Sequence, residues 1–347
     1  MDFPVVSAVG RTEGGRDTAF CHHRVSLTQE RFTAQSDPDT GGPRPGLTEE
    51  WGLLTDYQVG IARDGRDWTA ALPLQQALVD NARQEAAAAL DTAPDRRTDI
   101  DRNRIHILAV GEENLGQILW GQQDPGCVTH FERAAELSRA IGDRREEGVV
   151  AFNLGHAYLA IPSLRDLDRA EHWYRRDLDL TDERDRIGRA RTTGQLGMVA
   201  QERFLDARAA GQPEPVLLGH LNAAVAAYRN ALDLLPADAV PDRATVHHQL
   251  GVIYRNAGDY DTALTHYQQS IRLQEAAGDR YGAGQTRHAV AVLLAAAGRT
   301  GDALLYARAA LADYAPYGAG ATADIEQVQE LIDFLDPAAE PTRDGAP

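Results

Sequence analysis

Cysteine and histidine are the residues of this chain that could bind a metal, but their spacing does not complete a site. Cys127 and His130 are spaced like half of a zinc-binding set, and Cys21 stands next to His22 and His23. A structural zinc site takes four such ligands, and no second half follows in the sequence. We therefore expect neither a metal nor a cofactor.

Amine chemistry, except through the N-terminus, is excluded because all 35 basic residues are arginine and the chain has no lysine. This removes Schiff-base catalysis and the lysine of nucleotide-binding phosphate loops. The motifs of zinc proteases and serine hydrolases do not occur either. Glu112 and Glu113 are the nearest approach to an acid–base pair. Neighbouring residues on a helix point in different directions, so we interpret both as ordinary charges.

The charge balance limits the partners that the chain could bind. Its 347 residues include 52 acidic and 35 basic side chains, which gives a net charge of −17. Such a chain is repelled by duplex nucleic acid and by anionic membranes. We see no signal peptide and no apolar run long enough to span a membrane, so we expect a cytoplasmic location. Heavy use of Ala, Arg, Asp and Gly without Lys indicates a bacterial genome of high GC content.

Helical spacing of apolar residues covers 48–335, whereas 1–47 and 336–347 are rich in Gly and Pro and are expected to be flexible tails. No strand pattern occurs. Within the helical part, Leu250–Tyr267 aligns with Val290–Ala307 at an offset of 40 residues, and Asn114–Phe131 and Asn153–Tyr174 follow the same pattern. The repetition predicts helical hairpins that stack, because one hairpin cannot bury its apolar face alone.

The repeated residue types have a packing reason. A small residue such as Gly251 in the first helix allows the second helix to cross closely, and Ala263 in the second helix accepts that contact. A large residue four positions later, such as Tyr267, fills the remaining space.

The pattern L-G-x-x-Y followed by A-x-x-x-Y resembles the tetratricopeptide repeat family, most clearly over Ala244–Leu273. The resemblance implies an all-α fold, a right-handed superhelical stack of about six hairpins with a C-terminal capping helix. The expected hairpins are 48–90, 100–140, 145–181, 187–235, 242–276 and 281–314, closed by a helix at 321–335. The first is the weakest match, with Val59 in place of the glycine and Gln75 in place of the aromatic residue.

Linkers that contain Gly-Asp-Arg make the resemblance more specific. They occur at Ala140–Gly148 and Ala276–Gly284, where glycine would end one helix and aspartate would cap the next. This variant is similar to the Pins/LGN type of repeat and to the arrays of bacterial STAND-class signalling ATPases. An insertion at 201–219 contains Gly-Gln-Pro-Glu-Pro, from which we expect a loop that could close over the groove, or simply tolerated length.

In this family the first helices line a concave groove. The residues one position before each signature leucine are carboxamides, which would form a ladder that binds a peptide backbone. They are Asn114, Asn153, Gln195 and Gln249. The other interpretation is that these amides only support neighbouring helices.

Further positions are expected to face the same groove. They are Gln117, Trp120, Phe152, His156, Arg191, Met198, His248, Arg255 and His288. Arginines beside apolar anchors suit a peptide with apolar side chains and an acidic group. Trp120 and Phe152 could equally be core between repeats.

The sequence therefore predicts a non-enzymatic scaffold or regulatory adaptor that binds a protein or peptide. Two alternatives remain open. One is an enzyme or enzyme subunit that uses His156, His248 or His288 with Glu113 in the groove. The other is a homodimer, because repeat stacks with exposed apolar ends associate readily.

Overall fold

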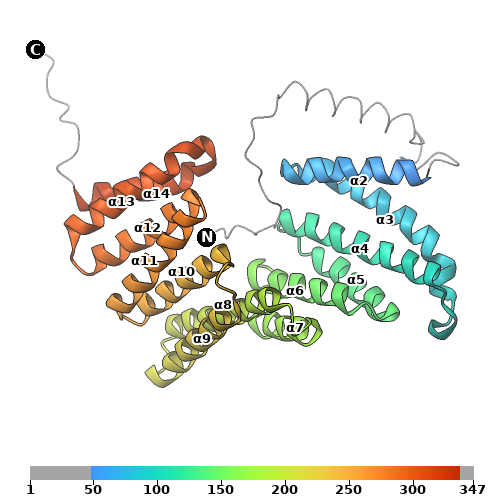
Figure 1. The fold of residues 1–347 in the computed structure, drawn as a ribbon, viewed down its shortest axis with the longest axis horizontal. Helices are drawn as coiled ribbons and strands as arrows, with labels where there is room; N and C mark the ends of the chain where they lie inside the picture. The colour runs from blue at the N-terminus through green and yellow to red at the C-terminus, as the bar shows by residue number, and fades with distance from the viewer. Residues whose placement is uncertain (1–47, 337–347) are drawn as a thin grey trace, which may run out of the picture. The chain divides into compact units, whose positions relative to one another are not determined.

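The computed structural model describes residues 48–336, so both predicted tails lie outside the described residues apart from Asp336. Every regular element between 48 and 336 is helical, and no strand occurs there. The chain divides into two compact units, which Figure 1 shows in blue to green and in green to red. Unit 1 ends at Asp143 and unit 2 begins at Arg144. None of the helices in these residues combines the length and apolar character needed to cross a membrane.

Unit 1 consists of two helical hairpins. The helices are α2 (Thr48–Asp64), α3 (Trp68–Asp91), α4 (Asp99–Gly121) and α5 (Cys127–Ile141), with the short η1 (Pro94–Arg96) before α4. Helix α3 packs against both α2 and α4, and α4 packs against α5. Trp51 and Val59 are buried on the face of α2 that meets the rest of the unit.

Unit 2 consists of four hairpins and a closing helix. The elements are α6 (Arg144–Ala160), α7 (Leu167–Leu180), α8 (Arg186–Ala209), α9 (Glu214–Leu234), α10 (Val240–Asn256), α11 (Tyr260–Ala276), α12 (Arg280–Ala296), α13 (Thr300–Tyr314), η2 (Ala315–Ala321) and α14 (Thr322–Leu335). Each hairpin packs against the next, and α14 covers α12 and α13. The predicted all-α hairpin stack is thus confirmed within each unit.

The predicted close approach at the small residues is confirmed in four hairpins. An aromatic ring of the second helix lies against a glycine of the first, so close that an added Cβ would come within 2.9 Å of the ring. The pairs are Gly116–Phe131, Gly155–Tyr174, Gly197–Tyr228 and Gly251–Tyr267. In the last hairpin, Ala291 and Ala307 are both fully buried. In the first, Gln75 is buried and donates instead to the backbone oxygen of Gly111, at 3.0 Å.

Both linkers have the left-handed glycine that the Gly-Asp-Arg pattern predicts, and the linker before α12 also has the aspartate cap. Gly142 and Gly278 end their helices with φ of 75° and 72°, a left-handed conformation that glycine adopts without strain. Asp279 then caps α12 by accepting a hydrogen bond from the amide of Gly282, at 2.9 Å.

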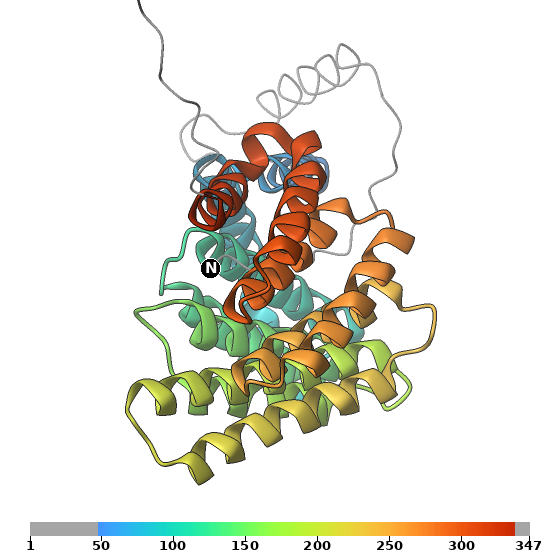
Figure 2. The same ribbon diagram turned by 90° about the vertical axis from the view of Figure 1, so that its left-hand side faces the viewer.

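The prediction of a loop at 201–219 is wrong, because most of these residues are helical. Helix α8 runs to Ala209 and α9 begins at Glu214, so the extra residues lengthen both helices and leave a short turn (Figure 2). Phe204 and Leu221 are buried between the extensions, which stabilises the longer hairpin. Pro213 precedes the first turn of α9, where proline is tolerated because those amides have no intrahelical partner.

Candidate functional site

The amides of α4 are already engaged within unit 1. Arg63 of α2 donates to Oδ1 of Asn114 at 2.9 Å and to Oε1 of Gln117. Gln117 in turn donates to the carboxylate of Glu113. The indole nitrogen of Trp120 is buried without a hydrogen-bond partner among the described residues. Sequence reasoning missed Arg63 because nothing in the first hairpin marks which α4 residue it reaches.

Helix α6 places Phe152 and His156 in an aromatic cluster with Tyr174 of α7. The ring centroids of Phe152 and His156 are 4.5 Å apart, and His156 and Tyr174 meet edge to face at 5.5 Å. The hydroxyl of Tyr174 lies 3.2 Å from Nδ1 of His156. Burial lowers the pKa of His156, so its imidazole is neutral at pH 7. Asn153 lies beside this cluster on α6 and is half-buried.

Helix α8 carries Arg191, Gln195 and Met198, and the arginine is not a free cation. Its guanidinium pairs with Asp242 at the start of α10, with Nε 2.6 Å from Oδ1. The hydrogen bond to this carboxylate raises the pKa of Arg191 further. Gln195 and Met198 are half-buried. An acidic ligand would have to compete with Asp242 for Arg191.

Helix α10 holds His248 in a fixed tautomer. Nδ1 of His248 lies 3.0 Å from Oγ1 of Thr286 on α12. Thr286 donates its single proton to Oε1 of Gln274, at 2.9 Å. Nδ1 of His248 is therefore the donor, and Nε2 is left as an acceptor. Burial, and then the charge of Arg255, lowers the pKa of His248 to about 4.

Gln249 departs from the expected ladder. Its side chain is only 6% exposed, so its amide is not presented to solvent as a groove-lining residue would be. The four carboxamides also differ in their surroundings, because Arg63 already donates to the oxygen of Asn114.

Arg255 is half-buried, and its guanidinium has no hydrogen bond or ion pair among the described residues. It lies near His288, whose pKa is lowered by burial and further by the charge of Arg255, although Asp324 opposes the shift. The ring of Tyr267 meets His248 at 5.5 Å, and its hydroxyl is buried without a hydrogen-bond partner among residues 48–336. Burial raises the pKa of Tyr267 to about 12. We call His248, Arg255, Tyr267 and His288 the α10–α12 cluster.

The hydroxyl of Tyr267 is a buried polar group that sequence reasoning missed. In the repeat pattern Tyr267 counts only as a space-filling ring. A phenylalanine, as at Phe131, would fill the same space without a polar atom, so the tyrosine itself was the available signal.

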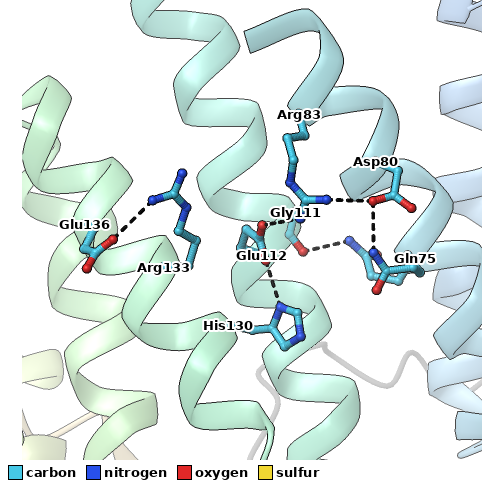
Figure 3. A network of polar contacts seen from close by, with 9 residues as sticks. Gln75, Asp80, Arg83, Gly111, Glu112, His130, Arg133 and Glu136 are labelled. Carbon is cyan, nitrogen blue, oxygen red and sulfur yellow. Dashed lines mark hydrogen bonds and ion pairs between the residues drawn. The ribbon is translucent and has the colours of Figure 1, made fainter. Parts of the chain in front are cut away.

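Glu112 and Glu113 are not ordinary solvated charges, which corrects the sequence interpretation. Both side chains are buried. Figure 3 shows Glu112 between Arg83 at 2.9 Å and Nδ1 of His130 at 2.8 Å. Burial alone would raise the pKa of Glu112, but hydrogen bonds from His130 and Arg83 lower it below its ordinary value.

The Cys127–His130 pair is divided between two structural roles. His130 contacts Glu112 (Figure 3). Cys127 is fully buried, and burial raises the pKa of its thiol to about 11. Among residues 48–336, no group of three histidine, cysteine or acidic side chains is arranged to hold a metal ion.

Comparison with known proteins agrees with this architecture. Residues 242–315, which span α10 to α13, match the family model described as tetratricopeptide repeat. The crystal structure of BtubC (BKLC) from P. vanneervenii is similar in fold, with a TM-score of 0.51 and 16% identity over 79% of this chain and 96% of that chain. No curated protein matches the sequence. The family match supports a repeat protein of the tetratricopeptide type, and such repeats are in general protein-interaction scaffolds.

Proposed function

We propose that this chain is a non-enzymatic scaffold that binds a segment of a partner protein, and that the α10–α12 cluster recognises an acidic group of that segment. The observation that carries the proposal is Arg255. Many arginines of this chain form ion pairs, for example Arg191 with Asp242 and Arg287 with Asp313. Arg255 is half-buried and has no such partner among the described residues. A partly desolvated guanidinium without a counter-ion favours a carboxylate ligand.

The neighbours of Arg255 define the rest of the ligand. Nε2 of neutral His248 accepts a hydrogen bond, as a peptide N–H requires. Val252 and Val292 supply apolar surface on the same two helices. A peptide with an acidic side chain next to apolar ones satisfies all of these groups.

The enzyme alternative has no observation in its favour. In the described residues, none of His156, His248 and His288 is hydrogen-bonded to a carboxylate. Glu113 accepts a hydrogen bond from Gln117 of α4. A regulatory adaptor in the bacterial cytoplasm, of the Pins/LGN-like variant, remains our wider proposal. It is supported by the Gly-Asp-Arg linkers of the sequence and by the family match.

A displayed library of random peptides tests the proposal. Selection on the wild-type chain should enrich peptides that contain Asp or Glu next to apolar residues. Arg255→Gln should weaken their binding by about tenfold or more, since a charge-assisted contact is worth about 1.5–3 kcal/mol. Arg272→Gln is the matched control, because Arg272 is exposed and its guanidinium donates to Gln269, outside the α10–α12 cluster.

Three results would contradict the proposal. The selection could yield no binders, the binders could lack acidic residues, or their affinity could fall equally in Arg255→Gln and Arg272→Gln. Circular dichroism of both variants establishes that the helices are intact.

A further inference from the structure

Helix α2, the first described helix of unit 1, is apolar on two opposite sides. One stripe is buried against the unit and consists of Trp51, Thr55 and Val59, with exposed fractions of 0%, 0% and 2%. The other faces solvent and consists of Leu53, Tyr57 and Ile61, with exposed fractions of 70%, 49% and 37%. Residues four apart lie one above the other on a helix, so the exposed stripe is continuous. We call it the α2 stripe.

A helix at the surface normally turns polar residues outward, and one that is apolar all round is normally covered. Repeat stacks need ends with a polar outer face to stay soluble. Helix α14 in unit 2 meets this requirement. It buries Val328 and Ile332 and exposes Glu326 and Glu330, and Phe334 near its end is the one large apolar side chain that it exposes strongly. The α2 stripe has no counterpart of this cover among the described residues.

The chain itself supplies a candidate cover, because 47 residues precede α2 and lead directly into Thr48. Four large apolar side chains lie between positions 20 and 32 of that segment, namely Phe20, Val25, Leu27 and Phe32. Residues 33–47 that follow contain Gly41, Gly42 and Gly46, and they reach up to about 50 Å when extended. The stripe is only about 12 Å long from Leu53 to Ile61, so the segment can return to any part of it.

A tethered segment also has an advantage over a second copy of the chain. Because residues 33–47 tether the segment to α2, its effective concentration at the stripe is of millimolar order, above that of a separate molecule at ordinary protein concentrations. The apolar residues at positions 3–9 are further from α2 in sequence and include Pro4, which restricts the backbone. We propose that residues 20–32 of this same chain dock on the α2 stripe and cover the first helix of unit 1.

Hydroxyl-radical footprinting of the full-length chain tests this inference, with Tyr57 as the reporter. Tyr260 on α11 is the reference, because its exposed fraction of 37% is below the 49% of Tyr57. Without a cover, Tyr57 should be modified at least as fast as Tyr260. With the cover, Tyr57 should be modified about fivefold more slowly, since even a weak preference for the docked state produces that factor.

Variants of the segment identify the occupant. Phe20→Ser with Leu27→Ser should restore rapid modification of Tyr57, whereas Arg24→Ser with Gln29→Ser should not. The substitutions of both variants lie outside residues 48–336, so we expect the helices to remain folded. Circular dichroism checks this. The inference is overturned if Tyr57 in the wild type reacts as fast as Tyr260, or if the Phe20 and Leu27 changes leave its protection intact. It is also overturned if protection appears only where light scattering shows a dimer, because the cover would then be a second copy.

Discussion

The contact between glycine and a tyrosine ring explains both the packing of the hairpins and their unpaired hydroxyls. The rings of Tyr228 and Tyr267 pack against Gly197 and Gly251, so each phenol lies in the contact between the two helices of its hairpin. Neither hydroxyl has a hydrogen-bond partner among the described residues. The apolar gain from burying a ring, at about 25 cal/mol per Å², offsets the cost of leaving the hydroxyl unpaired.

Gly251→Ala should destabilise unit 2 by about 1–3 kcal/mol. The new Cβ would stand 2.5 Å from Cδ1 of the Tyr267 ring, which is fully buried. The better helix propensity of alanine recovers at most about 1 kcal/mol of this loss. Urea denaturation followed by circular dichroism measures the change in the free energy of unfolding.

Gly219→Ala is the matched control for this substitution. Gly219 also lies inside a helix, α9, but an added Cβ there meets nothing within 4 Å. It should therefore stabilise the chain slightly. A Gly251→Ala chain as stable as the wild type would show that the ring contact does not limit the approach of α10 and α11.

At the scale of elements, polar bridges join helices that the repeat pattern treats only as neighbours. His248 of α10 donates to Thr286 of α12, and Thr286 donates to Gln274 of α11. The imidazole of His248 is neutral in this bridge, because burial and the charge of Arg255 both oppose a second proton. His247 is also opposed to protonation, by burial, by His266 and by two arginines, and its pKa falls to about 4.

Acid should therefore weaken unit 2. The pKa of His248 is about 4 in the folded chain and about 6.5 when unfolded. The unfolded state binds the proton first, so stability is complete above pH 6.5 and is lost as the pH falls toward 4. In that window each such histidine contributes a slope of up to about 1.4 kcal/mol per pH unit.

His248→Gln should reduce this slope, which urea denaturation at pH 7, 6, 5 and 4.5 measures. Thr245→Val, on the same helix and without a titratable group, controls for the substitution itself. An unchanged slope in His248→Gln would show that this histidine takes up its proton in the folded chain as readily as in the unfolded one.

At the scale of the whole molecule, the stability of each hairpin depends on the hairpins next to it, because a repeat contacts mainly its neighbours. In unit 2, α14 closes the series. Its Val328 and Ile332 pack in one cluster with Ala291, Ala307 and Tyr314 of the last hairpin. The end hairpin thus depends on α14 directly, whereas the hairpin of α6 and α7 packs against α8 at the other end of the series.

Val328→Ser with Ile332→Ser should cost about 2–4 kcal/mol at the last hairpin, by loss of buried apolar groups. Hydrogen exchange should show faster exchange in α12 and α13 and little change in α6 and α7. Glu326→Ser with Glu330→Ser, on the exposed side of α14, is the control and should leave exchange unchanged. Equal acceleration throughout unit 2 would contradict the nearest-neighbour description.

The sequence alone was enough to predict the hairpins. Small residues such as Gly251 and Ala263 recur at matched positions because only they allow two helices to cross so closely. A large ring such as Tyr267 then fills the remaining space, and both requirements act within one hairpin. The Gly-Asp-Arg linkers were predictable for the same reason, since a left-handed glycine and an aspartate cap act within one turn. The insertion at 201–219 was not, because its helical extension depends on packing of Phe204 against a distant Leu221.

Only the tertiary structure decided which side chains remain available to a ligand. Periodicity assigns a residue to a face of its helix, but the partner that it meets there comes from another helix. Arg191 and Arg255 are alike in the sequence, yet Asp242 of the next hairpin neutralises one and nothing described neutralises the other. Gln249 and Glu112 are buried for the same reason. Distances between helices are set by packing of the whole repeat, and no local pattern encodes them.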